Sequence, residues 1–418
     1  MREAFVEPGA TPPAGHHPGA SLYVATGRVL THYSFDADDC SLVEHGDLLL
    51  PNTIQFGWPH PHRPVLYLSC GVGQGINEDG NWACALQLDP DTGAPSLLGP
   101  ATAIPGRALH LTTDGSGAHL VLAHTRPAGL SVLRLGAEGT IEAAVDQRPG
   151  VDVGIFPHQV RITPDNRWCI CVARGLPSSH AWRASVEPQA EPGSVHVFAY
   201  DDGRLGESST VVLGDGSHFG PRNLDFAGPW AALGLETQNE IVVFGQDRDG
   251  RLNGDPVQRF STLVDPEAEV HQGAGPVLVH PQRGVVYLTN RAYRPGAIAA
   301  EDKVIPAAGE NSIVVYAIDP HTGALREIQR ISSGGACPRT LSLDPTGRML
   351  VVANSETYRI DHGHRVERIP MNLSTFRVLE DGRLAARHRY ETDDDADIAW
   401  SGIASHAPSR RRPMEQTT

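Results

Sequence analysis

Two short stretches of the chain carry, at both of their ends, side chains that could transfer protons or bind anions. In FPHQVRITPDNRWCICVARG, a strand–turn–strand pattern has His158 near its start and Arg174 near its end. A second stretch of this kind begins with Arg222 and ends with Glu236. An imidazole titrates near neutral pH, and a guanidinium binds carboxylate or phosphate through two parallel hydrogen bonds. Because a hairpin returns its ends to one place, we expect each pair to lie together.

The same strand–turn–strand unit recurs along the chain and determines the expected fold. It begins near residues 54, 106, 157, 221, 274 and 338, so that the copies lie roughly 50 to 65 residues apart,. Each copy continues into a third strand with alternating apolar residues and, after a turn, into a short fourth strand. No stretch shows helical periodicity,. Four antiparallel strands per copy are typical of the blade of a β-propeller.

The two ends of the chain supply a seventh blade. Residues 22–45 read as the second to fourth strands of a blade that lacks its first, and DIAWSGIA (397–404) reads as an isolated first strand. Pairing them closes the ring and hides edge strands that would otherwise favour aggregation. The sequence therefore predicts an all-β, seven-bladed propeller of four-stranded antiparallel blades over residues 21–405. In this prediction residues 1–20 form an N-terminal arm and residues 406–418 a disordered tail,.

Blade geometry brings the polar ends of the repeats to one mouth of the central channel. The inner strand lines the channel and the second strand returns beside it, so the start of one and the end of the other share a rim. The inner-strand starts are Gln55, Arg107, His158, Arg222, Gly275 and Arg339, and the second-strand ends include Arg174, Glu236 and Arg291. Clustered arginines repel one another unless an anion lies between them. The mouth is thus predicted to bind an anionic small molecule, although each arginine alone would equally suit an ion pair between blades.

Three long loops join second and third strands at the same mouth. They span residues 175–193, 292–310 and 356–372. Long loops on a repeat scaffold usually cover or shape a binding site. We expect them to remodel the entrance, either as a lid or as a contact between subunits.

Composition argues against several classes of partner. A formal net charge of -15 disfavours nucleic acid and anionic membranes,. No apolar run is long enough for a membrane span, and the N-terminal sequence lacks the apolar core of a secretory signal,. The six cysteines form no CxxC pair, which is typical of reduced, buried thiols,. These features predict a cytoplasmic protein.

Histidine pairs elsewhere in the chain lack the partners of a metal site. His16 and His17 lie in a Gly/Pro-rich segment, and His60 and His62 flank a turn, in both cases without spaced carboxylates,. The glycine-rich stretch GVGQGINEDG is not followed by a helical pattern, which argues against a nucleotide-binding loop,. We therefore expect neither a metal nor a cofactor.

Motifs in several repeats resemble those of a known family. The segments PHQVRITPDNRW, GPRNLDF, LGLETQNEIVVF, LTNR…NSIVVYAID and GGACPRTLSLDPTGRMLVVANSET are similar, in order and blade position, to the seven-bladed β-propeller lactonases. That family includes propeller-type bacterial 6-phosphogluconolactonase and the fungal carboxy-cis,cis-muconate cyclase. The resemblance implies a metal-free site with His158, Arg222, Glu236 and Arg291 as catalytic residues. The long insertions depart from the family pattern and predict a different pocket entrance.

Together the rim residues and the resemblance predict an enzyme that hydrolyses a small anionic lactone, such as that of a sugar acid. His158 would carry the proton, Arg222 and Arg291 would stabilise negative charge, and Glu236 would act as a second acid or base or orient an arginine. The expected substrate contacts are Arg339, Arg107, Arg174 and Gln55. Two alternatives stay open. One is a cycloisomerase that forms or opens a carboxy-muconate-type lactone from a polycarboxylate, and the other is a non-catalytic propeller that binds partners.

Overall fold

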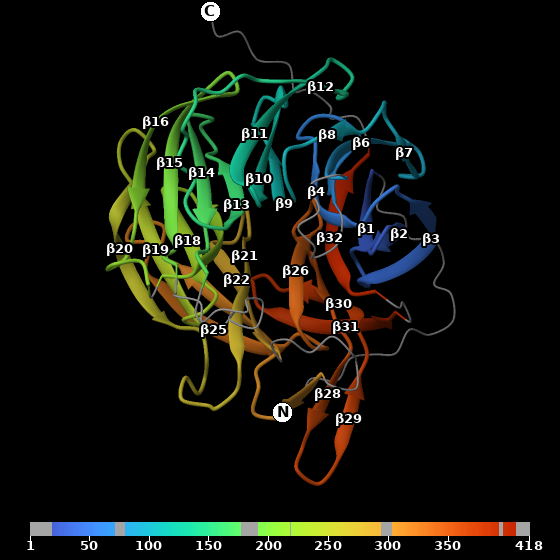
Figure 1. The fold of residues 1–418 in the computed structure, drawn as a ribbon. Helices are drawn as coiled ribbons and strands as arrows, with labels where there is room; N and C mark the ends of the chain where they lie inside the picture. Colours follow the sequence, from blue (N-terminus) through green and yellow to red (C-terminus); the bar gives the residue numbers. More distant parts are fainter. Residues whose placement is uncertain are drawn as a thin grey trace, which may run out of the picture.

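The computed structural model of the protein describes residues 19–71, 80–176, 191–217, 219–293, 303–392 and 396–406. In these residues the structure contains no helix, and seven sheets radiate from one axis (Figure 1). Six of the sheets have four strands, and the seventh gains a fifth strand, β8 (Thr102–Ala103), that pairs with β6. The inner strands contact one another in succession around the axis, and the contact of β26 with β32 closes the ring. The predicted seven antiparallel blades are confirmed.

Each blade consists of four strands arranged from the axis outward. The inner strands are β32 (Ile398–Ser405), β4 (Ile54–Pro59), β9 (Ala108–Thr113), β13 (Pro157–Ile162), β17 (Pro221–Ala227), β21 (Gln272–Val279) and β26 (Pro338–Leu343). The second strands are β1 (Ala20–Thr26), β5 (Val65–Cys70), β10 (His119–Thr125), β14 (Trp168–Ala173), β18 (Trp230–Leu235), β22 (Val285–Ala292) and β27 (Met349–Asn354). The third strands are β2 (Val29–Asp36), β6 (Trp82–Leu88), β11 (Ala128–Leu135), β15 (Ser194–Asp201), β19 (Glu240–Gln246), β24 (Ser312–Ile318) and β30 (Asn372–Val378). The outer strands are β3 (Ser41–Leu49), β7 (Pro95–Leu97), β12 (Ile141–Ala144), β16 (Arg204–Val211), β20 (Leu252–Ser261), β25 (Leu325–Ser332) and β31 (Leu384–Glu391).

The residue pattern changes from the axis outward because neighbouring blades cover both faces of the middle strands. The second strands β5 (VLYLSC) and β27 (MLVVAN) are buried at every position, whereas the outer strand β20 is largely exposed,. Turns between inner and second strands need a residue with positive φ, which is Asn166 (63°) in TPDN and Gly347 (69°) in DPTG,. The hydrophobic core is therefore divided into layers between blades, one of which joins Leu22 of β1 to Val351 of β27.

The ring closes through the two ends of the chain, as predicted. Strands β1 and β32 pair antiparallel, with Ala20 opposite Ser405 and Thr26 opposite Ile398. Residues 1–18 of the predicted arm and 407–418 of the predicted tail lie outside the described residues. All six cysteines are free and buried, in agreement with the expected reduced thiols.

Two of the three long loops meet in a small additional sheet, here called the auxiliary sheet. Strand β23 (Val304–Pro306) lies parallel to β28 (Tyr358–Asp361), and β28 forms a hairpin with β29 (Val366–Ile369). The hairpin projects from the ring in Figure 1. Residues 177–190 and 294–302, which belong to the other parts of the predicted long loops, lie outside the described residues.

Candidate functional site

A β-bulge in every inner strand places one extra residue at the central channel. In β13, Pro157 pairs with Ala173 and Gln159 pairs with Val172, so that His158 has no partner across the ladder. Bulges bend a strand and re-aim its side chains. In β21 the two residues Gly275 and Pro276 face one residue of β22. In ring order from β32, the bulge residues are Ala399, Gln55, Leu109, His158, Arg222, Pro276 and Arg339.

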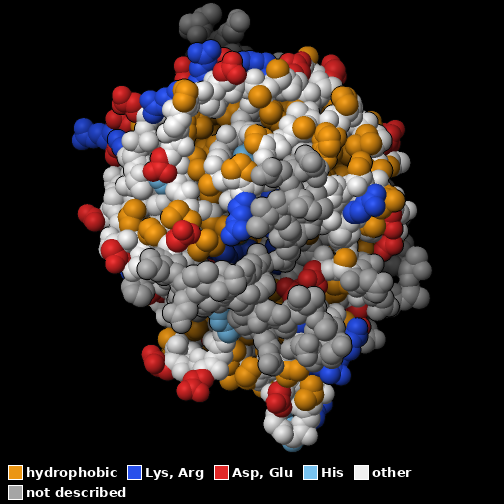
Figure 2. All heavy atoms as spheres, in the orientation of Figure 1, with side chains coloured by type: hydrophobic (Ala, Val, Ile, Leu, Met, Phe, Trp, Pro, Cys, Tyr) orange, Lys and Arg blue, Asp and Glu red, His pale blue; other side chains and the backbone are white. Residues whose placement is uncertain are grey.

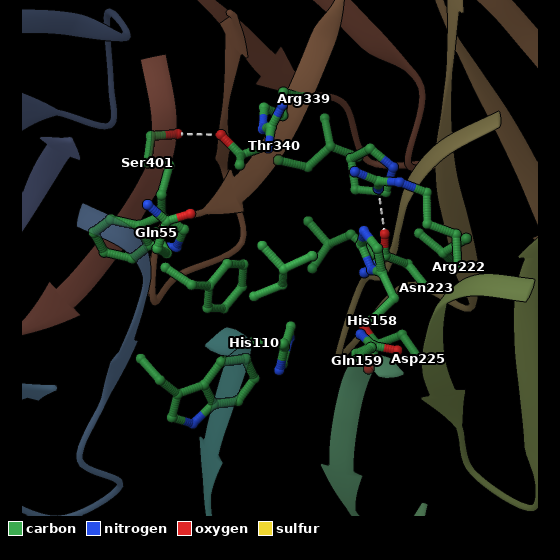
Figure 3. A pocket seen from close by; sticks show the side chains of 18 of the residues that line it. Gln55, His110, His158, Gln159, Arg222, Asn223, Asp225, Arg339, Thr340 and Ser401 are labelled. Atoms are coloured by element: carbon green, nitrogen blue, oxygen red, sulfur yellow. Dashed lines mark hydrogen bonds between the residues drawn. The ribbon is translucent and has the colours of Figure 1, made fainter. Parts of the chain in front are cut away.

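All of these bulge residues line a cavity in the channel, and Figure 3 labels four of them: Gln55, His158, Arg222 and Arg339. The cavity measures about 170 Å³, many times the roughly 10–15 Å³ that one buried water requires,. The residue that follows each bulge lines it as well: Trp400, Phe56, His110, Gln159, Asn223, Val277 and Thr340. The cavity therefore has room for a small ligand that would contact every blade.

The bulges decide which predicted rim residues reach the cavity. Four of them occupy bulges and line it: Gln55, His158, Arg222 and Arg339. Arg107 lies outside this lining because the bulge of β9 falls two residues later, at Leu109. The start of an inner strand was predicted from its distance to the following turn. In this blade the prediction fails because Thr112 and Thr113 resemble the beginning of a polar turn but still belong to β9. Arg107 instead donates from Nε to Oε1 of Gln55 at 2.7 Å.

Glu236, directly after β18, binds arginines from three blades. Its Oε2 accepts a hydrogen bond from Nη1 of Arg174 at 2.7 Å, and its Oε1 accepts one from Nη2 of Arg291. Nε of Arg222 lies 3.3 Å from the same Oε1. Burial would raise the pKa of Glu236, but the charges of Arg174, Arg291 and Arg222 hold it well below its usual value. Of the two predicted roles for Glu236, this geometry favours the orientation of arginines over acid–base chemistry.

This network keeps Arg174 and Arg291 out of the lining of the cavity. Arg174 also lies over the ring of Phe156, 4.6 Å from its centroid, and Arg291 donates to the carbonyl of Ala274 at 3.3 Å. Three guanidinium groups and one carboxylate carry a formal charge of +2, all on side chains that are at most 10% exposed. Buried charges of one sign attract a counter-ion. Figure 2 shows the face of the molecule that is turned to the viewer in Figure 1. Lys and Arg side chains lie at its middle, where the inner strands converge.

His158 and Arg222 face the cavity from adjacent blades (Figure 3). Nδ1 of His158 is buried without a hydrogen-bond partner among the described residues. Burial and the charge of Arg222 lower the pKa of His158 well below 6.5, so the imidazole is neutral at neutral pH. The expectation that it titrates near neutrality is therefore wrong. Burial and Arg291 lower the pKa of Arg222 to about 9, which leaves it a cation at neutral pH.

Arg339 brings a second positive charge to the cavity from β26 (Figure 3). Within the described part of the chain, no hydrogen bond or ion pair involves its guanidinium. The amide of Gln55, by contrast, is already bonded to Arg107 and to the carbonyl of Thr53. Arg339 is thus the cavity residue best placed to bind an anionic group of a ligand.

Several further residues of the cavity were missed by the repeat alignment. His110 is 3% exposed, and its Nδ1 has no hydrogen-bond partner in the described structure. Its ring lies 5.7 Å from that of Trp58, which also lines the cavity. Asp225 and Arg161 form an ion pair at 2.8 Å in the same wall. The available signal was the presence of His, Arg and Asp inside otherwise apolar inner strands such as ALHLTT and PRNLDF.

The histidine pair His60 and His62 connects two blades. Nε2 of His60 lies 3.1 Å from the carbonyl oxygen of Gly117, and Nε2 of His62 lies 2.9 Å from that of Gly115. Among the described residues, no group of three or more His, Cys, Asp or Glu side chains is arranged to hold a metal ion. The same part of the chain contains no helix that is long and apolar enough to cross a membrane. His16 and His17 lie outside it.

Comparisons with known proteins agree with this architecture. The chain is 22% identical over 281 residues, 65% of its length and 70% of the relative's, to 6-phosphogluconolactonase of Bacillus subtilis (strain 168). Its fold is similar to that of a periplasmic gluconolactonase of Pseudomonas aeruginosa, with a TM-score of 0.68, 20% identity and coverage of 92% of this chain and 98% of the other. A protein of Lactobacillus plantarum gives the same TM-score and identity, with coverage of 93% and 99%.

The family comparison covers most of the propeller. The model described as "Lactonase, 7-bladed beta-propeller" matches residues 25–369. This range holds the inner strands of six blades, and with them His158, Arg222, Glu236 and Arg339. The chain therefore belongs to the seven-bladed β-propeller lactonase family, as its motifs predicted.

Proposed function

We propose that the protein hydrolyses a small anionic lactone in the central cavity. One observation carries the proposal: a neutral imidazole, His158, and two cationic guanidinium groups, Arg222 and Arg339, line the same cavity. Membership of the lactonase family supports it, as do the names of the Bacillus subtilis and Pseudomonas aeruginosa proteins. These comparisons favour hydrolysis over cycloisomerisation and over binding without catalysis.

The cavity residues can supply the steps of lactone opening. His158 accepts a proton from water as the water oxygen bonds to the carbonyl carbon, and Arg222 stabilises the oxyanion that forms. The bond between this carbon and the ring oxygen then breaks, and the leaving alkoxide takes the proton from His158. Because its pKa is lowered, the imidazole is neutral and can accept the proton from water, and its protonated form passes the proton on to the alkoxide. Arg339 holds the anionic group of the substrate, and the product is the open hydroxy acid.

Glu236, Arg174 and Arg291 have a positioning role in this scheme. They fix Arg222 from the side away from the cavity through the shared carboxylate of Glu236. A guanidinium that is already oriented loses no free energy to reorganisation when the oxyanion forms.

The test is the rate of acid release from 6-phosphogluconolactone, corrected for spontaneous hydrolysis. His158→Ala removes the base and Arg222→Ala the oxyanion donor, and each is expected to lower kcat about 10²–10⁴-fold. His321→Ala and Arg383→Ala, both at exposed positions, are matched controls that should retain the rate. Because the pKa of His158 lies well below 6.5, kcat should show no loss through protonation of this imidazole between pH 7 and pH 6,. Wild-type rates in both cavity variants would contradict the proposal.

A further inference from the structure

The wall of the cavity differs between its two sides. Charged and polar groups come from β13, β17 and β26, whose bulges carry His158, Arg222 and Arg339. The consecutive blades of β32, β4 and β9 contribute rings instead: Trp400, Phe56, Trp58 and His110, here called the aromatic sector. In Figure 3 His110 lies at the end of the cavity away from Arg339, and Gln55 lies across from Arg222.

The aromatic sector is continuous and held in place. The ring centroid of Phe56 lies 4.2 Å from that of His110 and 6.2 Å from that of Trp400. The guanidinium carbon of Arg161 lies 5.2 Å from the ring centroid of Trp58. A Cβ at Gly57 would lie 2.7 Å from the Trp400 ring, so this glycine lets the indole press against β4. Burial and the charges of Arg161 and Arg222 keep His110 neutral by lowering its pKa well below 6.5.

The uncharged polar side chains of the cavity are largely occupied by the protein itself. The amide of Gln159 donates to the carbonyl of Leu224 at 3.2 Å and accepts from its N–H at 2.7 Å. Oδ1 of Asn223 accepts a hydrogen bond from Arg222. The hydroxyls of Thr340 and Ser401 bond to each other at 2.6 Å.

The carboxylate of Asp225 is occupied as well. It accepts hydrogen bonds from Nη2 of Arg161 and from the backbone N–H of Val279, both at 2.8 Å, and from its neighbour Phe226 at 3.0 Å. Apart from the two imidazoles and the guanidinium groups of the lining, substrate hydroxyls buried in this cavity would therefore find few free partners, and an unpaired buried hydroxyl weakens binding,. An apolar group placed against the aromatic sector would instead gain the full benefit of burial.

We infer that the substrate is a lactone acid with an apolar body, alkyl- or aryl-substituted, rather than a polyhydroxylated sugar-acid lactone. This inference rests on the proposed lactone hydrolysis and specifies its substrate. The anionic group binds Arg339, the reacting carbonyl faces Arg222, and the apolar part lies against Phe56, Trp58 and Trp400. Trp58 and Trp400 are then specificity-determining residues that touch the part of the substrate remote from the reacting carbonyl.

The test compares two lactones that have the same six-membered ring and the same carboxylate, one with ring hydroxyls and one without. After correction for spontaneous hydrolysis, kcat/KM for the lactone without hydroxyls is expected to be higher by about 10- to 100-fold. Trp58→Ala should reduce this preference at least about tenfold, chiefly through KM, because the lost contact is made before and during the reaction. Trp58→Phe should keep most of the preference, and Trp168→Phe, outside the cavity lining, should keep all of it.

The possible outcomes separate the two proposals. Equal or faster hydrolysis of the hydroxylated lactone would overturn the apolar substrate class and leave lactone hydrolysis standing. If the protein hydrolyses none of the three compounds, neither of the two lactones nor 6-phosphogluconolactone, the proposed function itself is contradicted. An unchanged preference in a folded Trp58→Ala protein would remove Trp58 from the set of specificity-determining residues and overturn the assigned binding mode.

Discussion

At the scale of single residues, the site depends on how one carboxylate is shared. In the described structure, Glu236 is the only acidic side chain that forms ion pairs with Arg174, Arg222 and Arg291. Without it, three buried guanidinium groups would repel one another and lose their orientation. A residue that looked like an acid–base candidate in the sequence is thus better understood as the centre of a charge network that supports Arg222.

Glu236→Gln should therefore be strongly destabilising. Removing one partner of a buried ion pair leaves uncompensated charge, and we expect the free energy of unfolding to fall by roughly 3–5 kcal/mol. Denaturant titration measures this loss. Glu240→Gln is the matched control, because Glu240 forms a more exposed pair with Arg259 and such pairs contribute about 0–1 kcal/mol,. Equal stability of the two variants would contradict the network's importance.

The effect of Glu236→Gln should also depend on pH. The pKa of Glu236 in the folded protein lies well below its value in the unfolded chain, which is about 4.3,. The stabilisation by this carboxylate is therefore complete at pH values above the pKa of the unfolded chain. It is lost as the pH falls towards and through the lower pKa of the folded protein. The difference between wild type and variant should accordingly shrink in acid.

At the scale of elements, bulges and inserted loops turn a regular repeat into a specific site. The bulges give each inner strand one unpaired residue at the cavity, and the seven blades use that position for different chemistry. The auxiliary sheet is attached to the blades of β27 and β32 through Lys303, whose side chain is buried (7% exposed). Its Nζ lies 2.8 Å from Oε2 of Glu356, after β27, and 3.4 Å from Oδ1 of Asp397, before β32.

Lys303→Met should loosen the auxiliary sheet without unfolding the blades. The substitution leaves Glu356 without its cation, so amide hydrogen exchange in β23 and β28 should accelerate while exchange in β27 and β30 is retained. Arg365→Met serves as the control, since its pair with Glu367 lies at the exposed hairpin. Identical exchange of β23 and β28 in the two variants would show that the Lys303 pairs do not hold the sheet.

At the scale of the whole molecule, one strand closes the ring and completes the cavity. β32 pairs with β1, and its Trp400 packs in the same core layer as Leu66 and Leu68 of β5. Ile398 packs in the adjacent layer with Met349 of β27. The closing strand therefore supports both neighbouring blades and also supplies Trp400 to the aromatic sector.

Ending the chain after Asp397 should consequently destabilise the entire propeller. The truncation exposes the edge of β1 and opens two core layers, so we expect a lower Tm and association through the free edge. Thermal unfolding and size-exclusion chromatography measure these effects. A chain ended after His406 keeps β32 and should retain the Tm of the full chain, in line with the predicted disordered tail. Equal Tm values for the two truncations would contradict the role of the closing strand.

The sequence by itself determined the repeat, the number of blades, the closing pair of strands and the family. These features depend on patterns that are local in the chain: alternation within strands, turn residues such as the TPDN of residues 163–166, and a regular spacing of repeats,. The same patterns placed His158, Arg222, Gln55 and Arg339 at one mouth, because a hairpin fixes where its ends lie.

Only the tertiary structure decided which rim residues reach the cavity and in what charge state. The bulge at Leu109 instead of Arg107 depends on the register of a strand pair, which alternation alone does not reveal,. The neutrality of His158 and the three-way pairing of Glu236 arise from burial and from charges on other blades. Most of these interactions join residues more than 50 positions apart, as in the Arg291–Glu236 pair with a separation of 55, and they are set by blade packing.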